Sequence, residues 1–293
     1  MYTTLISAPQ LQALLASGTP CKVFDCSFDL MQPAAGPAMY AQAHIPGAVY
    51  AHLDQHLSAP KDPATGQPAP GNAASGGRHP LPTREAFAAW LGSVGLEPAM
   101  QAVVYDRQGA NYCGRLWWML KWLGHAHVAV LDGGLQAWQA AGGAVASGAQ
   151  ATFTPSNYTP APALLGLVAT KTVADNLGRA SQTVLDARAA PRFRGEVEPL
   201  DPVAGHIPGA LNRPFSDNLG PDGKFKPAAQ LQSEFLALLG HRDPATVVHH
   251  CGSGVSAVPN LLAMQVAGLG PTALYAGSWS EWSNTPGLPV AQG

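Results

Sequence analysis

The two halves of the chain carry the same short motifs in the same order. The pentapeptide HIPGA occupies residues 44–48 and again 206–210, each time after a short apolar run that ends in aspartate. Near the end of each half lies a tryptophan-containing segment, LDGGLQAW at 131–138 and LYAGSWSEW at 274–282. A repeat of this length indicates two similar domains, each with its own core, and it pairs the positions of one half with those of the other.

Short β-branched runs alternate with longer segments of helical periodicity in both halves. Parallel strands need long crossover connections, which helices usually provide. The expected fold class is therefore α/β, with two tandem domains that each hold a central, mainly parallel sheet flanked by helices. Two helix starts are expected, with Thr83 as a capping residue and Pro227 at the first helical position.

Composition along the chain predicts the domain boundaries. Residues 146–166 are rich in Ala, Pro, Ser and Thr and lack periodicity, so we expect a linker there. It would join an N-terminal domain, 1–145, to a C-terminal domain, 167–293. The first half also contains a Gly- and Pro-rich insertion between residues 59 and 80. Such insertions are most often flexible surface excursions, but long ordered loops also carry functional residues.

Charge and cysteine content exclude several kinds of partner. Charged residues make up 12% of the chain and the formal net charge is -2, so no basic surface for nucleic acid is expected. No apolar run reaches the roughly 18 residues of a membrane span, and no basic segment precedes the first apolar residues, so we expect a soluble, cytoplasmic protein. The four cysteines form neither a disulfide framework nor a zinc pattern, and no metal or organic cofactor is expected.

The segment CGSGVS at residues 251–256 joins an expected buried strand, 247–250, to an expected helix that begins at Ala257. Its two glycines permit positive φ, so the turn can curl until several backbone N–H groups point to one spot. Such a nest at a helix N-terminus stabilises an anion and favours the thiolate of Cys251. The alternative is a small buried hydrophobic residue, which is the role expected of the other three cysteines: Cys21, Cys26 and Cys113.

The equivalent position in the first half is Asp106, so that half cannot perform thiolate chemistry. One domain is therefore expected to be catalytic and the other to be its non-catalytic partner. Phosphatases with a nucleophilic cysteine need an arginine six positions further on to clamp phosphate, and this chain has Ala257 there. That class is excluded.

Taken together, the repeated halves, both HIPGA segments, the tryptophan-containing segments and the CGSGVS loop resemble the tandem-domain rhodanese family. The resemblance runs from Val23 to Trp282, and the loop is most similar to that of the mercaptopyruvate sulfurtransferases in this family. It implies two rhodanese-like domains and a sulfurtransferase that carries sulfur as a persulfide on Cys251. The sulfur would come from a small anionic donor and pass to a thiol, to cyanide or to a protein acceptor such as a thioredoxin-like protein.

The same resemblance implies a proton relay that helps to cleave the carbon–sulfur bond of mercaptopyruvate. Matched motif by motif, the loop serine is Ser253, the aspartate is Asp54 and the histidine is His79, within the insertion. If the insertion folds toward the loop, His79 would lie within hydrogen-bond reach of Ser253, and Asp54 would fix the imidazole tautomer.

A donor-binding site is implied as well. Arg192 matches the family's substrate-binding arginine, which can grip a carboxylate or sulfonate with two hydrogen bonds. The loop residues expected to contact the donor are Gly252, Gly254, Val255 and Ser256. Mercaptopyruvate enzymes carry a second arginine a few residues later, where this chain has Leu200. Arg194 is a candidate substitute, whereas Arg188 is expected to form a structural ion pair.

The predicted activity is 3-mercaptopyruvate sulfurtransfer, and two alternatives remain. Thiosulfate-preferring members carry adjacent arginine and lysine in the loop, where this chain has Gly252 and Ser253, so thiosulfate:cyanide sulfurtransfer is the second prediction. The third is a non-catalytic rhodanese-like binding or sulfur-sensing module. Some further residues are assigned structural roles: His44 and His206 in turns, and Trp279 and Trp282 in the core.

Overall fold

The computed structural model describes residues 1–293 and divides the chain into two compact units. The first unit comprises Met1–Pro60, Pro82–Leu164 and Pro221–Lys224, and the second comprises Lys61–Leu81, Leu165–Gly220 and Phe225–Gly293. The insertion of the first half therefore packs with the second unit. None of the helices has the length and apolarity needed to cross a bilayer.

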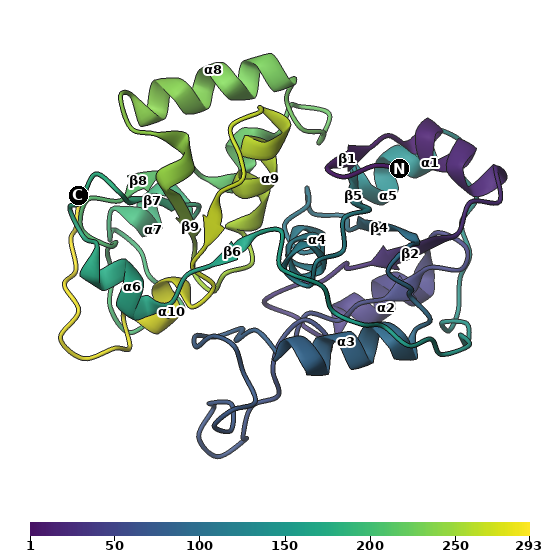
Figure 1. Ribbon diagram of the computed structural model, residues 1–293, viewed down its shortest axis with the longest axis horizontal. Coiled ribbons are helices and arrows are strands. Elements are labelled where there is room, and N and C mark those ends of the chain that lie inside the picture. Colours follow the sequence, from purple (N-terminus) through teal and green to yellow (C-terminus); the bar gives the residue numbers. More distant parts are fainter. The chain divides into compact units, whose positions relative to one another are not determined.

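The first unit is built on a five-stranded parallel sheet in the order β1-β5-β4-β2-β3 (Figure 1). Its strands are β1 (Leu5–Ile6), β2 (Cys21–Asp25), β3 (Val49–Tyr50), β4 (Gln101–Tyr105) and β5 (Val128–Leu131). Its helices are α1 (Ala8–Ala16), α2 (Ala35–Gln42), α3 (Arg84–Ser93), α4 (Cys113–Trp122) and α5 (Gly134–Ala140).

The second unit repeats this arrangement, with a parallel sheet in the order β6-β10-β9-β7-β8. Its strands are β6 (Gly166–Leu167), β7 (Thr183–Asp186), β8 (Leu211–Asn212), β9 (Val247–His250) and β10 (Ala273–Leu274). Its helices are α6 (Thr170–Asp175), α7 (Ala190–Phe193), α8 (Ala228–Leu239), α9 (Val258–Val266) and α10 (Ser278–Trp282), with 3-10 turns at Phe215–Asn218 and Pro244–Thr246. The two sheets match strand for strand, so the predicted α/β fold with duplicated parallel sheets is confirmed.

Buried side chains of both units fill the space between sheet and helices. In the second unit, Trp279 and Trp282 of α10 pack with Val184 and Val248, which project from one face of the sheet. In the first unit, Trp138 of α5 occupies the corresponding core. The expected core role of both tryptophans of α10 is confirmed, since each is at most 1% exposed.

The starts of α3 and α8 can be compared with the two helix starts predicted from the sequence. Thr83 caps α3, and its hydroxyl accepts the Ala86 N–H as expected. Pro227 lies just outside α8 as its capping residue, one position earlier than predicted. The φ of proline suits either position, so sequence alone does not separate them.

The histidines of both HIPGA segments play equivalent structural roles. His44 stacks on Tyr40, and its Nδ1 lies 2.8 Å from the Tyr40 carbonyl oxygen. His206 stacks on Phe193 in the same way, also 2.8 Å from the carbonyl oxygen of its stacking partner. Both rings thus pack against an aromatic residue of a preceding helix, Tyr40 of α2 or Phe193 of α7, as expected for structural residues.

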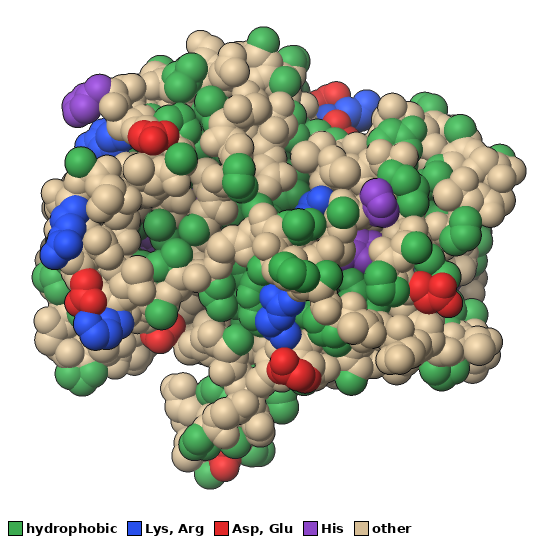
Figure 2. Space-filling model, viewed as in Figure 1, with side chains coloured by type: hydrophobic (Ala, Val, Ile, Leu, Met, Phe, Trp, Pro, Cys, Tyr) green, Lys and Arg blue, Asp and Glu red, His purple; other side chains and the backbone are tan.

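Basic and acidic side chains lie interspersed on the molecular face drawn in Figure 2, rather than gathering into a basic patch. This distribution agrees with the small formal net charge of -2. The face drawn in Figure 2 therefore shows no cluster of the positive charge with which proteins bind nucleic acid.

Candidate active site around Cys251

Cys251 follows the last residue of β9, a strand whose four residues are all buried. Six residues, 252–257, lead from Cys251 to the first residue of α9, with Pro259 in the first turn of that helix. This is the predicted strand, loop and helix. The Cys251 residue itself is 2% exposed, so the loop wraps closely around its side chain.

The first turn of α10 holds the loop in place. The Cys251 N–H donates to the Ser278 hydroxyl at 3.1 Å, and Cys251 and Gly252 accept through their carbonyl oxygens from Trp279 and Ser280 at 3.0 and 2.8 Å. Ser278 adopts a φ of 56°, an uncommon conformation for a residue with a side chain. Strain of this kind persists where the surroundings over-determine the backbone, and here it positions the nucleophile's loop.

The two loop glycines meet different constraints. Gly254 has a φ of 72°, and a Cβ there would lie 2.3 Å from the Ala276 carbonyl oxygen, so only glycine fits. Gly252 does not adopt positive φ. A Cβ at Gly252 would instead lie 3.3 Å from Nη2 of Arg78 and 3.5 Å from Nη1 of Arg192. Gly252 therefore allows two guanidinium groups to approach the loop.

The first repeat displays what this loop geometry stabilises. Asp106 follows β4 as Cys251 follows β9, and six residues again separate it from the next helix. Its carboxylate accepts backbone N–H groups from Gln108, Ala110, Tyr112 and Cys113 at 2.9 to 3.1 Å. In the second repeat no acceptor within the chain receives the N–H groups of Gly252, Ser253, Val255 and Ser256. The N–H groups of the Cys251 loop are thus available to bind an anion. In the first repeat, the equivalent loop binds the carboxylate of Asp106 instead.

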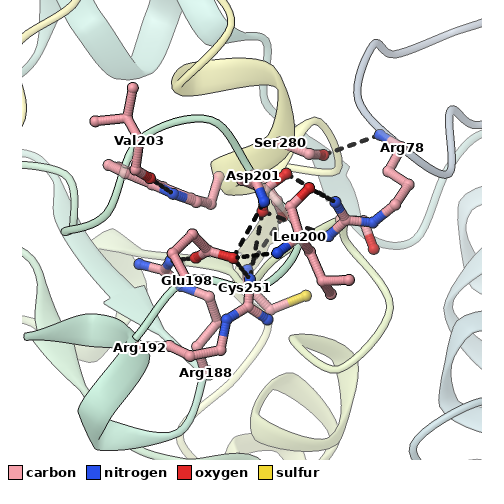
Figure 3. A network of polar contacts seen from close by, with 12 residues as sticks. Arg78, Arg188, Arg192, Glu198, Leu200, Asp201, Val203, Cys251 and Ser280 are labelled. Carbon is pink, nitrogen blue, oxygen red and sulfur yellow. Dashed lines mark hydrogen bonds and ion pairs between the residues drawn. The ribbon is translucent and has the colours of Figure 1, made fainter. Parts of the chain in front are cut away.

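A network of arginines and carboxylates lies beside the loop (Figure 3). Arg192 donates to Glu198 Oε1 at 2.6 Å and to Asp201 Oδ2 at 3.3 Å, and its side chain remains 20% exposed. Arg188 is fully engaged by Asp186, with three contacts of 2.7 to 3.2 Å, and it stacks over Trp279. Arg192 keeps part of its side chain open to a ligand beside its two carboxylate partners, whereas Arg188 is a structural ion-pair partner, as expected.

Arg78 is a residue that the sequence interpretation missed. Its Nη1 donates to Asp201 Oδ1 at 2.7 Å and to the Leu200 carbonyl oxygen at 3.3 Å. Arg194, the candidate substitute for the missing second arginine, instead pairs with Glu196 at the surface and is 44% exposed. The expectation for Arg194 is thus wrong: it lies just beyond the short helix α7, where its side chain turns outward. No local signal marked Arg78, because its partners lie more than a hundred positions away.

The insertion also brings His79 to the loop. His79 Nδ1 lies 2.8 Å from Ser253 Oγ, and both residues are buried. Asp54, the third member of the predicted relay, lies in the first unit on an exposed turn after β3, where its N–H donates to His52 Nδ1 at 3.1 Å. Its relay role stays a prediction.

Burial sets the protonation of the groups next to the loop. It lowers the pKa of His249 to about 3 and also lowers the pKa of His250, so both rings are neutral near pH 7. Burial would raise the pKa of the Asp186 carboxyl, but the charge and hydrogen bonds of the Arg188 guanidinium outweigh it and the pKa is lowered. Positive charge beside Cys251 therefore comes from arginines rather than from its neighbouring histidines.

The other cysteines are poor nucleophiles. Burial raises the pKa of Cys21 to about 11 and raises the pKa of Cys26 and Cys113 well above the ordinary thiol value. A thiol that stays protonated does not attack sulfur, because the thiolate is the reactive form. The structure contains no group of three or more His, Cys, Asp or Glu side chains that could hold a metal ion.

A family comparison identifies both repeats. The protein family described as "Rhodanese-like domain" matches the chain twice, over residues 7–141 and 169–285. The chain belongs to the rhodanese family. A Pseudomonas aeruginosa protein named "Probable 3-mercaptopyruvate sulfurtransferase" is 46% identical over 290 residues, which cover 99% of this chain and 98% of that protein.

Two further rhodanese relatives bear on the donor. An Arabidopsis thaliana protein named "Thiosulfate/3-mercaptopyruvate sulfurtransferase 1, mitochondrial" is 32% identical, over 92% of this chain and 73% of that protein. The solved structure titled "3-mercaptopyruvate sulfurtransferase from Leishmania major" matches with a TM-score of 0.78 and 30% identity, over 98% of this chain and 76% of that one. The names of these relatives include both 3-mercaptopyruvate and thiosulfate. The choice between the two donors therefore depends on the residues of this rhodanese itself.

Proposed function

We propose that this rhodanese is a sulfurtransferase that takes sulfur from 3-mercaptopyruvate onto Cys251 and passes it to a thiol, cyanide or protein acceptor. The observation that carries the proposal is the 2.8 Å contact between His79 Nδ1 and Ser253 Oγ on the cysteine's own loop. Mercaptopyruvate cleavage releases an enolate that must be protonated, whereas thiosulfate cleavage releases sulfite and needs no proton on carbon. A buried histidine–serine pair beside the nucleophile suits the first donor.

The first half-reaction forms the persulfide. The Cys251 thiolate attacks the sulfur of 3-mercaptopyruvate, so that an S–S bond forms while the C–S bond breaks and its electron pair leaves on the carbon of the pyruvate enolate. The proton of the donor thiol passes through Ser253 and His79 to that carbon, which yields pyruvate and leaves Cys251 as a persulfide anion. Backbone N–H groups of the loop stabilise the charged sulfur.

The second half-reaction regenerates the enzyme. The acceptor thiol gives its proton to the persulfide anion. The resulting acceptor thiolate attacks the outer sulfur, forms a new persulfide on the acceptor and releases the Cys251 thiolate. A small thiol, cyanide or the exposed cysteine of a thioredoxin-like protein has the necessary nucleophilicity. Relatives whose names give sulfurtransferase activity, including the protein that is 46% identical over 99% of the chain, support this assignment.

Thiosulfate is the second candidate donor. The loop itself is neutral at Gly252 and Ser253, which disfavours a compact dianion. Two guanidinium groups nevertheless approach Gly252, and they can answer the charge of thiosulfate as well as that of a carboxylate. The name of the Arabidopsis relative includes both donors.

Steady-state kinetics with each donor test the proposal. We expect a larger kcat/KM with 3-mercaptopyruvate than with thiosulfate, with pyruvate formed in proportion to the sulfur transferred. Higher kcat/KM with thiosulfate would assign the second donor. No turnover with either would leave the non-catalytic binding or sulfur-sensing module.

A further inference from the structure

Residues 196–201 lack the second arginine that the rhodanese resemblance predicts there. A residue of the insertion, Arg78, contacts this segment instead. At the expected position stands Leu200, whose carbonyl oxygen accepts from Nη1 of Arg78 at 3.3 Å. We infer that Arg78, from the insertion, supplies the second cation of the donor site and binds the donor's carboxylate together with Arg192. The inference rests on the proposed function and names the residue that selects its substrate.

Asp201 pairs both arginines. Its Oδ1 accepts from Arg78 at 2.7 Å and its Oδ2 from Arg192 at 3.3 Å, and the Asp201 side chain is only 2% exposed (Figure 3). One buried carboxylate thus holds two guanidinium groups side by side. A Cβ at Gly252 would lie 3.3 Å from the nearest nitrogen of one and 3.5 Å from that of the other, so both reach the residue next to Cys251.

Both guanidinium groups keep donors that the chain does not use. The Nε atoms of Arg78 and Arg192 are buried and have no hydrogen-bond partner. Leaving a buried charged donor unsatisfied is costly, so such atoms usually face a ligand or bound water. A carboxylate offers oxygens that can pair with arginine in the planar, two-bond geometry.

The path of the insertion explains how Arg78 is held. Its N–H donates to the Ser280 hydroxyl at 2.9 Å. Gly77 has a φ of 87°, and a Cβ there would lie 2.5 Å from the Gly277 carbonyl oxygen, so the backbone packs directly against the start of α10. Because α10 also holds the Cys251 loop, the same turn positions the nucleophile and the second cation.

A cavity of about 560 Å³ gives Arg78 access to solvent. It is lined by Arg78, Leu200, Asp201, Ser280 and Lys61, among others. Arg78 itself is 23% exposed at its side chain. Solvent therefore reaches one side of the Arg78 guanidinium through this cavity, which Cys251 and Arg192 do not line.

The test compares the full-length wild-type protein with Arg78→Gln, using pyruvate as the probe. Pyruvate carries the keto acid and carboxylate of the donor without its thiol, so calorimetric binding does not depend on turnover. We expect Arg78→Gln to weaken pyruvate binding about 10- to 100-fold and to raise KM for 3-mercaptopyruvate by a similar factor, with a smaller change in kcat. Arg194→Gln is the matched control, since that arginine lies at the surface, and it should bind pyruvate like the wild type.

Further variants separate binding from folding. Thermal denaturation should show Arg78→Gln folded, and if it is not, Arg78→Lys, which keeps the charge but loses the planar fork, should bind pyruvate with intermediate affinity. In Arg78→Gln/Leu200→Arg, the new arginine should restore much of the affinity, because it would stand where the family's second arginine is expected.

Three outcomes would overturn the inference: pyruvate binding in Arg78→Gln that equals the Arg194→Gln control, no measurable binding to the wild type, or a double variant no better than Arg78→Gln. Failure of the proposed function looks different. It would be a wild-type enzyme without turnover of 3-mercaptopyruvate, whereas the pyruvate titration would still report on Arg78.

Discussion

His79 Nδ1 lies 2.8 Å from Ser253 Oγ, although 174 positions separate the two residues in the sequence. Serine hydroxyls and imidazole nitrogens both donate and accept protons, so the pair can pass a proton in either direction. Both residues are buried, and their contact lies one residue beyond Gly252 on the loop of Cys251. We therefore interpret the insertion as a contributor of catalytic residues rather than as a flexible surface loop.

Replacing the relay should affect the two donors unequally. His79→Asn and Ser253→Ala are each expected to lower kcat for 3-mercaptopyruvate about 100-fold or more, because proton transfer by a placed side chain contributes that much. Thiosulfate cleavage needs no such proton, and its kcat should fall less than tenfold. Parallel assays with both donors measure the ratio. Equal losses with both donors would mean that the pair shapes the loop and does not move a proton.

The loop glycines provide a matched pair of variants. Gly254→Ala should lower the free energy of unfolding by about 1–3 kcal/mol and kcat/KM by about 100-fold, because the new methyl group meets the Ala276 carbonyl oxygen at positive φ. Gly252→Ala should stay within about 1 kcal/mol of the wild type, since flexible arginine ends can move, while KM for the donor rises. Chemical denaturation and steady-state kinetics distinguish them. The reverse ranking in stability would show that Gly254 is not under steric constraint.

The first repeat predicts a stability effect at Asp106. Asp106→Ala removes the acceptor of four backbone N–H groups, so we expect the free energy of unfolding to fall by about 2–4 kcal/mol. Asp106→Asn should recover only part of this loss, because its amide nitrogen cannot accept. Urea denaturation provides the measurement. If Asp106→Ala were as stable as the wild type, the Asp106 carboxylate would not be what stabilises this loop.

Much of the fold could be predicted because it depends on local pattern. Repeated motifs implied equivalent sheets, and the alternation of apolar runs with helical segments implied parallel strands, as observed. Thr83 is predictable as a cap because capping is a local hydrogen bond. The strand and helix around Cys251 followed from the apolar run of β9 and the first-turn proline of α9.

The donor site was less accessible to such reasoning. Arg78 meets Asp201 across 123 positions, and the path that joins them depends on Gly77 packing against the Gly277 carbonyl oxygen, a tertiary contact. Composition correctly described the insertion as rich in Gly and Pro, but it could not say where the backbone would lie. Arg194 lies close in sequence to the missing arginine, yet its guanidinium pairs with Glu196 at the surface.

Buried histidines should make the protein sensitive to acid. Burial lowers the pKa of His249 to about 3, and burial is likewise the main reason that the pKa of His56 and of His125 is lowered to about 4. In the unfolded chain these groups titrate near 6.5, so their neutral forms contribute fully to stability above that pH and the contribution is lost as the pH falls toward 3 to 4. Each can add up to about 1.4 kcal/mol per pH unit.

Denaturation between about pH 7 and pH 5 checks this slope. His249→Gln should flatten the dependence, even if the variant is less stable at neutral pH. A wild-type free energy of unfolding that does not change over this interval would mean that these rings become protonated without unfolding.

The central claim is that Cys251 is the atom that carries sulfur. Intact-protein mass spectrometry after exposure to 3-mercaptopyruvate, followed by removal of the donor, tests it directly. We expect one added sulfur atom, about 32 Da, located by peptide mapping on Cys251, lost on treatment with a thiol acceptor and absent from Cys251→Ser. Sulfur that appears instead on Cys113 or Cys26, or that persists in Cys251→Ser, would contradict the account.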